Sequence, residues 1–441
     1  MISRIGNTFA QKMVEGRFLG YLFLLLYKLI AGIIRLVSKV LIGILKLFTD
    51  LVCKILSYPD RLIAVLARRV LAKHTPVKDQ VMFLTFQGDY TCNPKYIAEE
   101  LIKQDTGARL VWDVKTAIPH SDYPIELQFV RHNSYEFFKE LAASKVIIEN
   151  TNIVERLYAY KKKDQYLLQT WHGSLGIKRL DGDVVMGFSW KHLAKKCQKS
   201  VDLLLSNSDF ETEVFRTAYW KDVPSVMVGH ARNDIFFLKD EEKIAKIRKK
   251  VCRFLNIDES RKIFLFAPTH RDDVDESYEA LDYALIRKAL EERFGGKWQI
   301  VIRLHNRLRK ESRIWLDDLP KYVSDATLYE DMQELLLVTD VGVTDYSSWI
   351  FDYVLSRRPG FIIELGLEDF KESRGFYYPI ETTPFPIAKD SAELAERIKS
   401  FDNDKYLKDV DRFLEERGCM EDGQASKRIA EKINELMKQS V

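Results

Sequence analysis

The 441-residue chain has few cysteines, and their pattern excludes the usual cysteine-based sites. They are odd in number, widely spaced and without a Cys-x-x-Cys motif: Cys53, Cys92, Cys197, Cys252 and Cys419. This arrangement argues against both a disulfide framework and a zinc site. Unpaired thiols fit a reducing compartment, and we expect each to be a small, partly buried side chain.

The chain also lacks a strong net charge, at +3, but its charge is unevenly distributed. Residues 1–80 contain 13 Lys and Arg against 4 Asp and Glu, and the remainder is mildly acidic. A basic end on an acidic body indicates an anionic partner, either lipid headgroups or nucleic acid. An apolar fraction of 46% with 30% charged residues is typical of a globular protein, and the length predicts two or three domains.

No uninterrupted apolar run in residues 18–58 reaches the 20 or so residues that a membrane-spanning helix needs. Basic residues break the segment at intervals that place most of them on one stripe of a helix: Arg17, Lys28, Arg35, Lys39, Lys46 and Lys54. This pattern predicts that residues 17–69 lie in the headgroup plane of an anionic membrane. A helical hairpin packed on the body and a spanning helix are the alternatives. Nucleic-acid binding is disfavoured, because the charge lies on a strongly apolar helix.

After Pro76, short β-rich runs alternate with helical stretches, which is typical of βα units around parallel sheets. Strand-like runs occupy residues 81–87, 110–115, 127–130, 145–150, 166–171, 202–207, 225–229, 262–268, 298–304, 335–346 and 360–364. Residues 391–439 are helical by composition. The sequence therefore predicts basic amphipathic helices in residues 1–75 and two α/β halves, 76–240 and 241–441, that face a cleft.

Ligands of doubly wound sheets bind at the carboxyl ends of the strands, so the residues after each predicted strand are candidates. His172 follows one strand and could act as a general base, because the pKa of histidine lies near neutral pH. Gly173 and Gly176 would let the backbone approach a substrate closely. A structural histidine is the alternative.

The second half offers two more strand ends. Pro268 and Thr269 follow one strand, and Arg303, Leu304 and His305 end another. Alternation along a strand places Arg303 and His305 on one face, where they could hold a pyrophosphate. A charged strand end in solvent is the alternative.

A third candidate is the strand–turn–helix junction at Ser347 and Ser348, whose hydroxyls and free N–H groups could bind phosphate. Ordinary helix capping is the alternative. Asp352, one turn later, could reach a ligand hydroxyl or complement the helix dipole. Arg232, just before the linker, could meet a donor phosphate across the cleft, or belong to a turn held by Asn233 and Asp234.

Taken in order, these segments resemble the CDP-glycerol glycerophosphotransferase family, which primes and polymerises wall teichoic acids in Gram-positive bacteria. The resemblance runs from about Val81 to the C-terminus. Its motifs are Asn93-Pro94-Lys95-Tyr96, Gln169 to Gly173, Arg232-Asn233-Asp234, Ala267-Pro268-Thr269, Arg303 with His305, Thr344 to Asp352, Arg374-Gly375-Phe376 and Asp422 to Ser426.

The resemblance implies a glycosyltransferase-B fold, with two Rossmann-like parallel-sheet domains behind a monotopic membrane attachment. It makes His172 the general base and His305 its catalytic partner, which holds the donor diphosphate with Arg303. The remaining substrate contacts would be Gly173, Ser174, Leu175, Gly176, Arg232, Pro268, Thr269, Leu304, Ser347, Ser348 and Asp352. Residues 76–240 would form the acceptor domain and residues 241–441 the CDP-polyol donor domain.

Three departures from the family pattern flank these sites. Ser174-Leu175-Gly176 replaces Thr-Pro-Leu, Asn306 replaces the Pro after the second His, and Gly229-His230-Ala231 replaces Gly-Tyr-Pro. They bear on the identity of the polyol or the acceptor more than on the chemistry.

The expected reaction transfers glycerol phosphate, or a related polyol phosphate, from CDP-glycerol to a hydroxyl of a lipid-linked acceptor and releases CMP. We expect no metal and no cofactor, and a peripheral location on the cytoplasmic face of the cell membrane. CDP-ribitol as donor, a nucleotide-sugar glycosyltransferase on the same fold, and a non-catalytic membrane scaffold are the alternatives. The sequence leaves open the acceptor, the number of units added and whether the chain forms a homo-oligomer.

Overall fold

The computed structural model describes residues 29–30, 70–71, 73–115, 123–151, 161–184, 199–269, 281–304, 320–365 and 375–439. The chain forms two compact units, Met1–Leu66 and Ala67–Val441. Apart from a few positions, the predicted membrane-binding segment lies outside the described residues. Within the described ranges, no helix combines the length and the apolar character needed to cross a bilayer.

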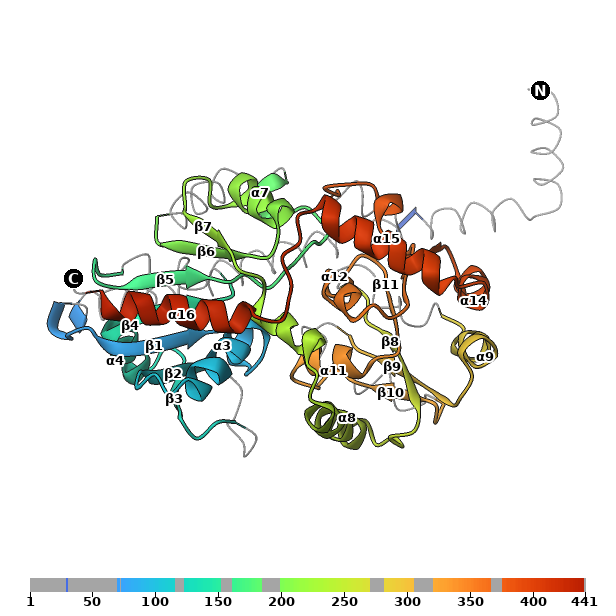
Figure 1. Cartoon of the computed structure of the whole chain (residues 1–441), viewed down its shortest axis with the longest axis horizontal. Coiled ribbons are helices and arrows are strands. Elements are labelled where there is room, and N and C mark those ends of the chain that lie inside the picture. The colour runs from blue at the N-terminus through green and yellow to red at the C-terminus, as the bar shows by residue number, and fades with distance from the viewer. Residues whose placement is uncertain are drawn as a thin grey trace, which may run out of the picture. The chain divides into compact units, whose positions relative to one another are not determined.

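The first sheet contains seven parallel strands in the order β3-β2-β1-β4-β5-β6-β7 (Figure 1). Its strands are β1 (Lys78–Leu84), β2 (Arg109–Val114), β3 (Leu127–Arg131), β4 (Ser144–Glu149), β5 (Tyr166–Gln169), β6 (Leu203–Ser206) and β7 (Ser225–Met227). The helices are η1 (Phe86–Gly88), α3 (Cys92–Lys103), α4 (Tyr135–Ala143), η2 (Asp181–Asp183), α7 (Asp209–Ala218) and η3 (Ala231–Phe237). The strand order reverses between β1 and β4, and ligands of doubly wound sheets bind at the carboxyl ends of the strands at such a reversal.

The second sheet repeats this topology with six parallel strands in the order β10-β9-β8-β11-β12-β13. Its strands are β8 (Lys262–Phe266), β9 (Trp298–Ile302), β10 (Val323–Asp325), β11 (Val341–Thr344), β12 (Gly360–Ile363) and β13 (Ile387–Ala388). The helices are α8 (Glu241–Leu255), α9 (Tyr283–Phe294), α11 (Met332–Val338), α12 (Trp349–Tyr353), η5 (Val354–Ser356), η6 (Ile380–Thr382), α14 (Ser391–Lys399) and α15 (Asn403–Glu416). Here the strand order reverses between β8 and β11.

The central strands are mostly apolar because the sheets are buried on both faces. Every residue of β9 is buried, and so are the last five of β1 and the last four of β8. Continuous burial is typical of parallel strands covered by helices on either side. The prediction of two parallel-sheet α/β halves is confirmed.

The last helix, α16 (Ala425–Lys438), returns to the first half (Figure 1). Its apolar face contributes Ile429, Ala430 and Ile433 to the core of the first sheet. By contrast, α14 and α15 pack on the second core. The carboxylate of Asp234 fixes the start of α16 by accepting hydrogen bonds from the backbone N–H groups of Ala425, at 2.9 Å, and Ser426, at 2.7 Å.

Each strand-like run of the sequence overlaps a strand, and from β5 onward the strands are shorter than the runs. The run at 335–346 holds the end of α11 and then β11, because a buried helix and a buried strand are equally apolar there. The sequence pattern did not predict α7, β10 or β13. Both missed strands are edge strands of two or three residues, which leave little periodicity to detect.

Candidate functional site

His172 lies three residues beyond β5, and its ring is anchored to the end of the neighbouring strand β4. Its Nδ1 is 2.7 Å from the backbone carbonyl oxygen of Asn150. A carbonyl oxygen only accepts hydrogen bonds, so Nδ1 carries the proton and the lone pair of the neutral ring lies on Nε2. This tautomer is the one that a general base needs.

The surroundings of His172 favour its neutral form. Its side chain is accessible to solvent, yet protein surrounds the ring closely enough to lower the pKa below that of an ordinary histidine. Desolvation is the largest cause, and the positive charges of Arg232 and Lys178 act in the same direction, whereas the hydrogen bond to Asn150 opposes them. His172 can therefore accept a proton at neutral pH.

The backbone next to His172 is held in an unusual conformation. Trp171 has a φ of 51°, in the left-handed region that large aromatic residues rarely adopt. Its ring packs on His172 with the centroids 4.4 Å apart. The backbone N–H of Trp171 donates to Oε1 of Gln169 at 2.8 Å. On α3, Asn93 Nδ2 donates to the carbonyl oxygens of Thr170 and Trp171, at 3.1 and 3.3 Å. These bonds fix the turn that presents the imidazole.

A buried ion pair joins this turn to the second half. Arg232 on η3 is 1% exposed and Asp352 on α12 is 5% exposed. The guanidinium donates two hydrogen bonds to the carboxylate, from Nε to Oδ2 at 2.9 Å and from Nη2 to Oδ1 at 3.1 Å. Nη2 also donates to the backbone carbonyl of Gly173. Burial is the largest single influence and would lower the pKa of Arg232, but the charge of Asp352, the hydrogen bond to it and the nearby Cys92 and Glu211 together raise the pKa.

Two side-chain amides also donate hydrogen bonds to Asp352. Asn233 Nδ2 and Gln333 Nε2 each donate to its carboxylate at 3.1 Å. Asp352 thus accepts hydrogen bonds from η3, which follows the first sheet, and from α11 of the second sheet. The sequence predicted that Arg232 and Asp352 bind substrate; the structure places them together, bonded to each other.

A second ionic bridge runs between α3 and α11. Lys95, buried in α3, donates to Oδ2 of Asp331 at 2.6 Å and to Oε1 of Glu334 at 2.8 Å. The hydroxyl of Tyr96 also donates to Asp331, at 3.1 Å. The Asn-Pro-Lys-Tyr motif of the sequence is therefore part of the contact between the two halves.

A buried polar cluster missed by the sequence analysis supports the segment after His172. Asn207 Nδ2 donates to Ser174 Oγ at 2.8 Å and to Oε1 of Glu421 at 3.0 Å. Glu211 contacts Nε2 of His230 at 2.8 Å. Burial raises the pKa of both Glu211 and Glu421 to about 8 and lowers the pKa of His230 far below its ordinary value. Only their positions near strand ends or motifs could have pointed to these residues.

In the second half, Asp345 ties together the loops that follow β8 and β11. It is fully buried and accepts hydrogen bonds from the backbone N–H groups of Thr269, at 2.7 Å, and Tyr346, at 2.6 Å. Pro268 is buried in the same loop. These contacts place the loop of Pro268 and Thr269 beside the junction before Ser347, at the reversal of the sheet.

The turn after His172 reaches the start of α12. A Cβ atom on Gly176 would lie 3.1 Å from Cβ of Ser348, so glycine permits this close approach. Ser347 and Ser348 are both partly exposed, and the side chain of Ser348 makes no capping hydrogen bond to α12. Leu175 is buried in the second core. The structure thus brings the His172 turn and the serine pair together.

The remaining predicted residues follow β9. Arg303 is 9% exposed, and its Nη1 donates to the backbone carbonyls of Ala326 and Tyr329. Leu304 is buried, with its N–H bonded to Thr327 Oγ1 at 3.0 Å. His305 lies outside the described residues, so its predicted role is not tested, and diphosphate binding by Arg303 stays a prediction.

No set of three or more His, Cys, Asp or Glu side chains in the described part of the chain could hold a metal ion. Arg232 and Lys95 are each paired with carboxylates of the second half. The described geometry provides a solvent-accessible base, His172, whose turn reaches Ser348, and the hydroxyl of Ser348 makes no capping hydrogen bond to α12.

Comparison with known proteins places this geometry in a family. The family model described as CDP-Glycerol:Poly(glycerophosphate) glycerophosphotransferase matches residues 66–435. A teichoic acid glycerol-phosphate transferase of Staphylococcus aureus is 30% identical over 384 residues, which cover 82% of this chain and 95% of the relative. A teichoic acid poly(glycerol phosphate) polymerase of Staphylococcus epidermidis is 29% identical over 376 residues, covering 81% of this chain. The chain spans about half the length of that polymerase, 51%.

Solved structures of the wall teichoic acid polymerase TagF have the same fold. One matches with a TM-score of 0.73 at 28% sequence identity and covers 88% of this chain and 96% of that chain. A histidine-to-asparagine variant of TagF soaked with CDPG matches with a TM-score of 0.73 at 27% identity and covers 88% and 98% of the two chains.

The buried ion pair predicts a large loss of stability when one partner is removed. Asp352→Ala leaves the Arg232 charge buried without its carboxylate, and we expect the free energy of unfolding to fall by about 3–5 kcal/mol. Urea denaturation measures the change. The matched control is Asp411→Ala, which removes the partner of Arg357 in a pair whose side chains are 51% and 58% exposed. That loss should stay below about 1 kcal/mol. Equal losses in the two variants would show that the buried Arg232–Asp352 pair stabilises the fold no more than an exposed pair does.

Proposed function

Because the chain belongs to the CDP-Glycerol:Poly(glycerophosphate) glycerophosphotransferase family, we propose that it transfers glycerol phosphate from CDP-glycerol to an acceptor hydroxyl and releases CMP. The acceptor is a lipid-linked saccharide or polyol phosphate, and the product is a teichoic acid or a related envelope polymer. The observation that carries the proposal is the His172 imidazole, whose Nδ1 is bonded to the Asn150 carbonyl and whose Nε2 is left as the base.

In the proposed reaction, Nε2 of His172 removes the proton of the acceptor hydroxyl. The acceptor oxygen forms a bond to the β-phosphorus, and the bond from that phosphorus to the bridging oxygen breaks, so CMP leaves with the electron pair. Arg303, His305 and the serine pair before α12 are proposed to stabilise charge on the transferred phosphoryl group and on CMP. Pro268 and Thr269 would line the same donor site.

Arg232 and Asp352 have a positioning role in this proposal. Both are buried, and Arg232 holds the Gly173 carbonyl directly after the base. We assign the acceptor to residues 76–240 and the CDP-polyol donor to residues 241–441, with the reaction at the turn where Gly176 meets Ser348.

Glycerol is the preferred polyol for two reasons. The Staphylococcus aureus relative that matches over most of its length is named a glycerol-phosphate transferase, and the soaked TagF structure is named for CDPG. Relatives named for ribitol phosphate match at 25–27%, below the 30% of this transferase. CDP-ribitol is therefore the alternative donor to be tested.

The donor and the base can be tested in one assay of nucleotide release. We expect CMP from CDP-glycerol but little from CDP-ribitol, and no nucleotide from a UDP-sugar, with membrane extract as the source of acceptor. His172→Ala should reduce CMP release about 10²–10⁴-fold, because that is the usual contribution of a general base. Chromatography of the released nucleotides gives the rates.

His132→Ala is the matched control, because this histidine pairs with Asp113 at the end of β2, away from the proposed site. It should retain its rate of CMP release. A His172→Ala protein with normal turnover would contradict the role of His172 as the base. Nucleotide release from the UDP-sugar alone would mean that the donor is a nucleotide sugar and not a CDP-polyol.

The lowered pKa of His172 predicts the acid side of the pH–rate profile. The base must be deprotonated, so kcat/KM should be full above its pKa and fall as the pH drops through it. An unperturbed histidine titrates at about 6.5; desolvation, Arg232 and Lys178 lower this pKa, so the limb should lie below 6.5. Lys178→Met removes one positive charge and should move the limb to higher pH. A limb above 6.5 in the wild type contradicts the assignment.

We further propose that residues 17–69 bind the anionic face of the cell membrane as a peripheral, basic-striped helical segment on the cytoplasmic side. Replacing Arg35, Lys39 and Lys46 with Gln should weaken binding to phosphatidylglycerol vesicles roughly 100-fold, since each basic residue near such a surface contributes about 1 kcal/mol. Vesicle co-sedimentation measures the binding.

The control for this experiment replaces three lysines on the surface of the described body, Lys246, Lys288 and Lys405, whose side chains are 74–76% exposed. This variant should bind vesicles like the wild type. Equal loss in both variants would indicate a general charge effect, and undiminished binding of the first variant would exclude the basic stripe as the attachment.

A further inference from the structure

Phe86 is an aromatic residue that lies beside the proposed base and is open to solvent. It begins η1, just beyond β1, and is 40% exposed, whereas Thr85 and Asp89 of the same turn are almost completely buried. The centroid of its ring is 6.4 Å from that of His172, with the two planes 27° apart, which is a contact distance for aromatic rings. An isolated exposed apolar side chain is common on protein surfaces, but this one is next to the group that must receive a proton.

The turn that carries Phe86 is fixed by hydrogen bonds to its backbone. The N–H of Phe86 donates to Oδ1 of Asn150 at 3.0 Å, and Nε1 of Trp112 donates to the carbonyl oxygen of Gly88 at 3.3 Å. Gly88 has a φ of 80°, and a Cβ atom on it would lie 2.5 Å from the backbone N of Lys115, so the turn lies directly against the end of β2. The ring of Phe86 is therefore presented to solvent from a rigid support.

Asn150 connects this turn to the base. It is buried just beyond β4, where its side-chain oxygen accepts the N–H of Phe86 and its backbone carbonyl oxygen accepts Nδ1–H of His172 at 2.7 Å. The strands β1 and β5 are the two neighbours of β4 in the sheet, so Asn150 lies between the segments that carry the two rings. One buried residue thus sets the positions of both the base and the exposed aromatic ring.

An acceptor that gives its proton to His172 comes within reach of Phe86. In a reactive complex the acceptor hydroxyl lies about 3 Å from Nε2 of the base. The carbon atoms that bear this hydroxyl come next, at a distance where a ring 6.4 Å from the imidazole can touch them. Both rings belong to the first half, whereas the proposed donor contacts Thr269 and Ser348 belong to the second, so Phe86 is on the acceptor side of the reaction.

The chemistry of the ring decides which part of an acceptor it can bind. A phenyl ring forms no conventional hydrogen bond, and the face of its π system is negative, so it does not attract a phosphate. It gains free energy by covering C–H groups, because the contact removes apolar surface from water. The group that packs on Phe86 is therefore carbon, and any phosphate of the acceptor lies farther from the base.

We propose that the exposed ring of Phe86 is an acceptor-binding surface, which packs on the carbon skeleton next to the hydroxyl that His172 deprotonates. The inference rests on the proposed function, because that function brings an acceptor hydroxyl to His172. It adds a residue that the sequence patterns did not single out. Phe86 contributes to the affinity for the acceptor, and it contributes neither to donor binding nor to the proton transfer itself.

The test separates acceptor affinity from chemistry. CMP release from CDP-glycerol is measured at about pH 8, above the pKa of an ordinary histidine, so that the base is deprotonated in every variant. Membrane extract is varied at saturating donor, and then the donor is varied at saturating extract. Phe86→Ala removes the ring but keeps the N–H that is bonded to Asn150. We expect the half-saturating amount of extract to rise roughly five- to tenfold, as for the partial burial of one aromatic ring, with kcat and the KM for CDP-glycerol unchanged.

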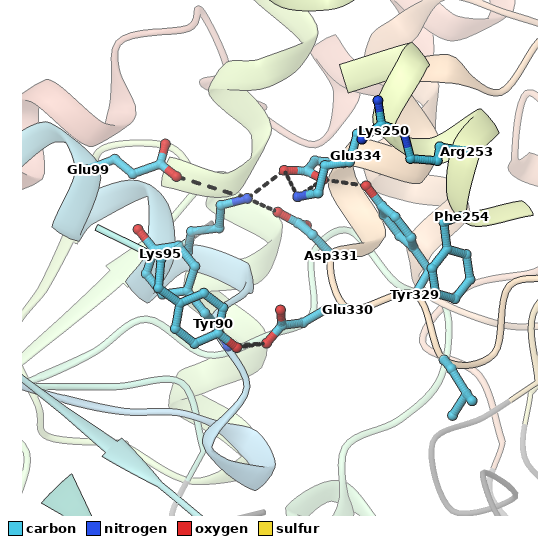
Figure 2. Close-up of a pocket in the computed structure, with 12 residues that line it drawn as sticks. Tyr90, Lys95, Glu99, Lys250, Arg253, Phe254, Tyr329, Glu330, Asp331 and Glu334 are labelled. Carbon is cyan, nitrogen blue, oxygen red and sulfur yellow. Dashed lines mark hydrogen bonds and ion pairs between the residues drawn. The ribbon is translucent and has the colours of Figure 1, made fainter. Parts of the chain in front are cut away.

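Two further variants serve as controls. Phe86→Tyr keeps the ring and should keep the half-saturating amount of extract found for the wild type. Phe254→Ala removes a ring of similar exposure elsewhere: Phe254 is 46% exposed on α8, where its ring meets that of Tyr329 edge to face with centroids 5.1 Å apart (Figure 2). This variant should also leave the half-saturating amount unchanged.

An unchanged half-saturating amount in Phe86→Ala, or a rise no larger than that of Phe254→Ala, would overturn the proposal. So would a rise in the KM for CDP-glycerol in its place, which would put the ring on the donor side, or a fall in kcat alone, which would make it a support for the base. A wild type that releases no CMP from CDP-glycerol would refute the proposed function and the acceptor role of Phe86 with it, so the two failures are distinguishable.

Discussion

The bidentate pairing of Arg232 with Asp352 is the interaction on which the candidate site depends. Both groups are almost completely removed from water, so each charge is stabilised chiefly by the other and by the amides around them. Because the fork of a guanidinium matches a carboxylate in one plane, the pair fixes orientation as well as distance. The Gly173 carbonyl is bonded to the same guanidinium, so the position of the His172 turn relative to α12 follows from this contact.

The sequence motifs that suggested substrate binding also hold the molecule together. Asn93 connects the His172 turn to Arg232, whose backbone N–H donates to Asn93 Oδ1 at 3.1 Å. Asn233 and Asp234 lie on the same short helix, η3. Asn233 is hydrogen-bonded to Asp352, and Asp234 is hydrogen-bonded to the start of α16. A motif that bridges two sheets is restricted in sequence by several partners at once, and the resulting rigidity is what a pre-organised transfer site requires.

The sequence predicted the sheets well because their strands are continuous apolar runs bounded by polar residues. It also placed His172 and Ser348 correctly at strand ends, where the two doubly wound sheets bring them near each other. It could not show that Arg232 pairs with Asp352, because a local pattern carries no information on a partner 120 residues away. The hydrogen bonding of Glu421 and the left-handed backbone of Trp171 were not predicted for a related reason, because both result from tertiary packing that overrides local preference.

The return of α16 to the first sheet has a consequence for the order in which the protein is made. A nascent chain emerges from the ribosome N-terminus first, and its domains usually fold in that order. Here the first half lacks the apolar face of Ile429, Ala430 and Ile433 until the second half has been synthesised. Its core therefore stays partly uncovered through most of translation, and the early half becomes complete only when the late one has emerged.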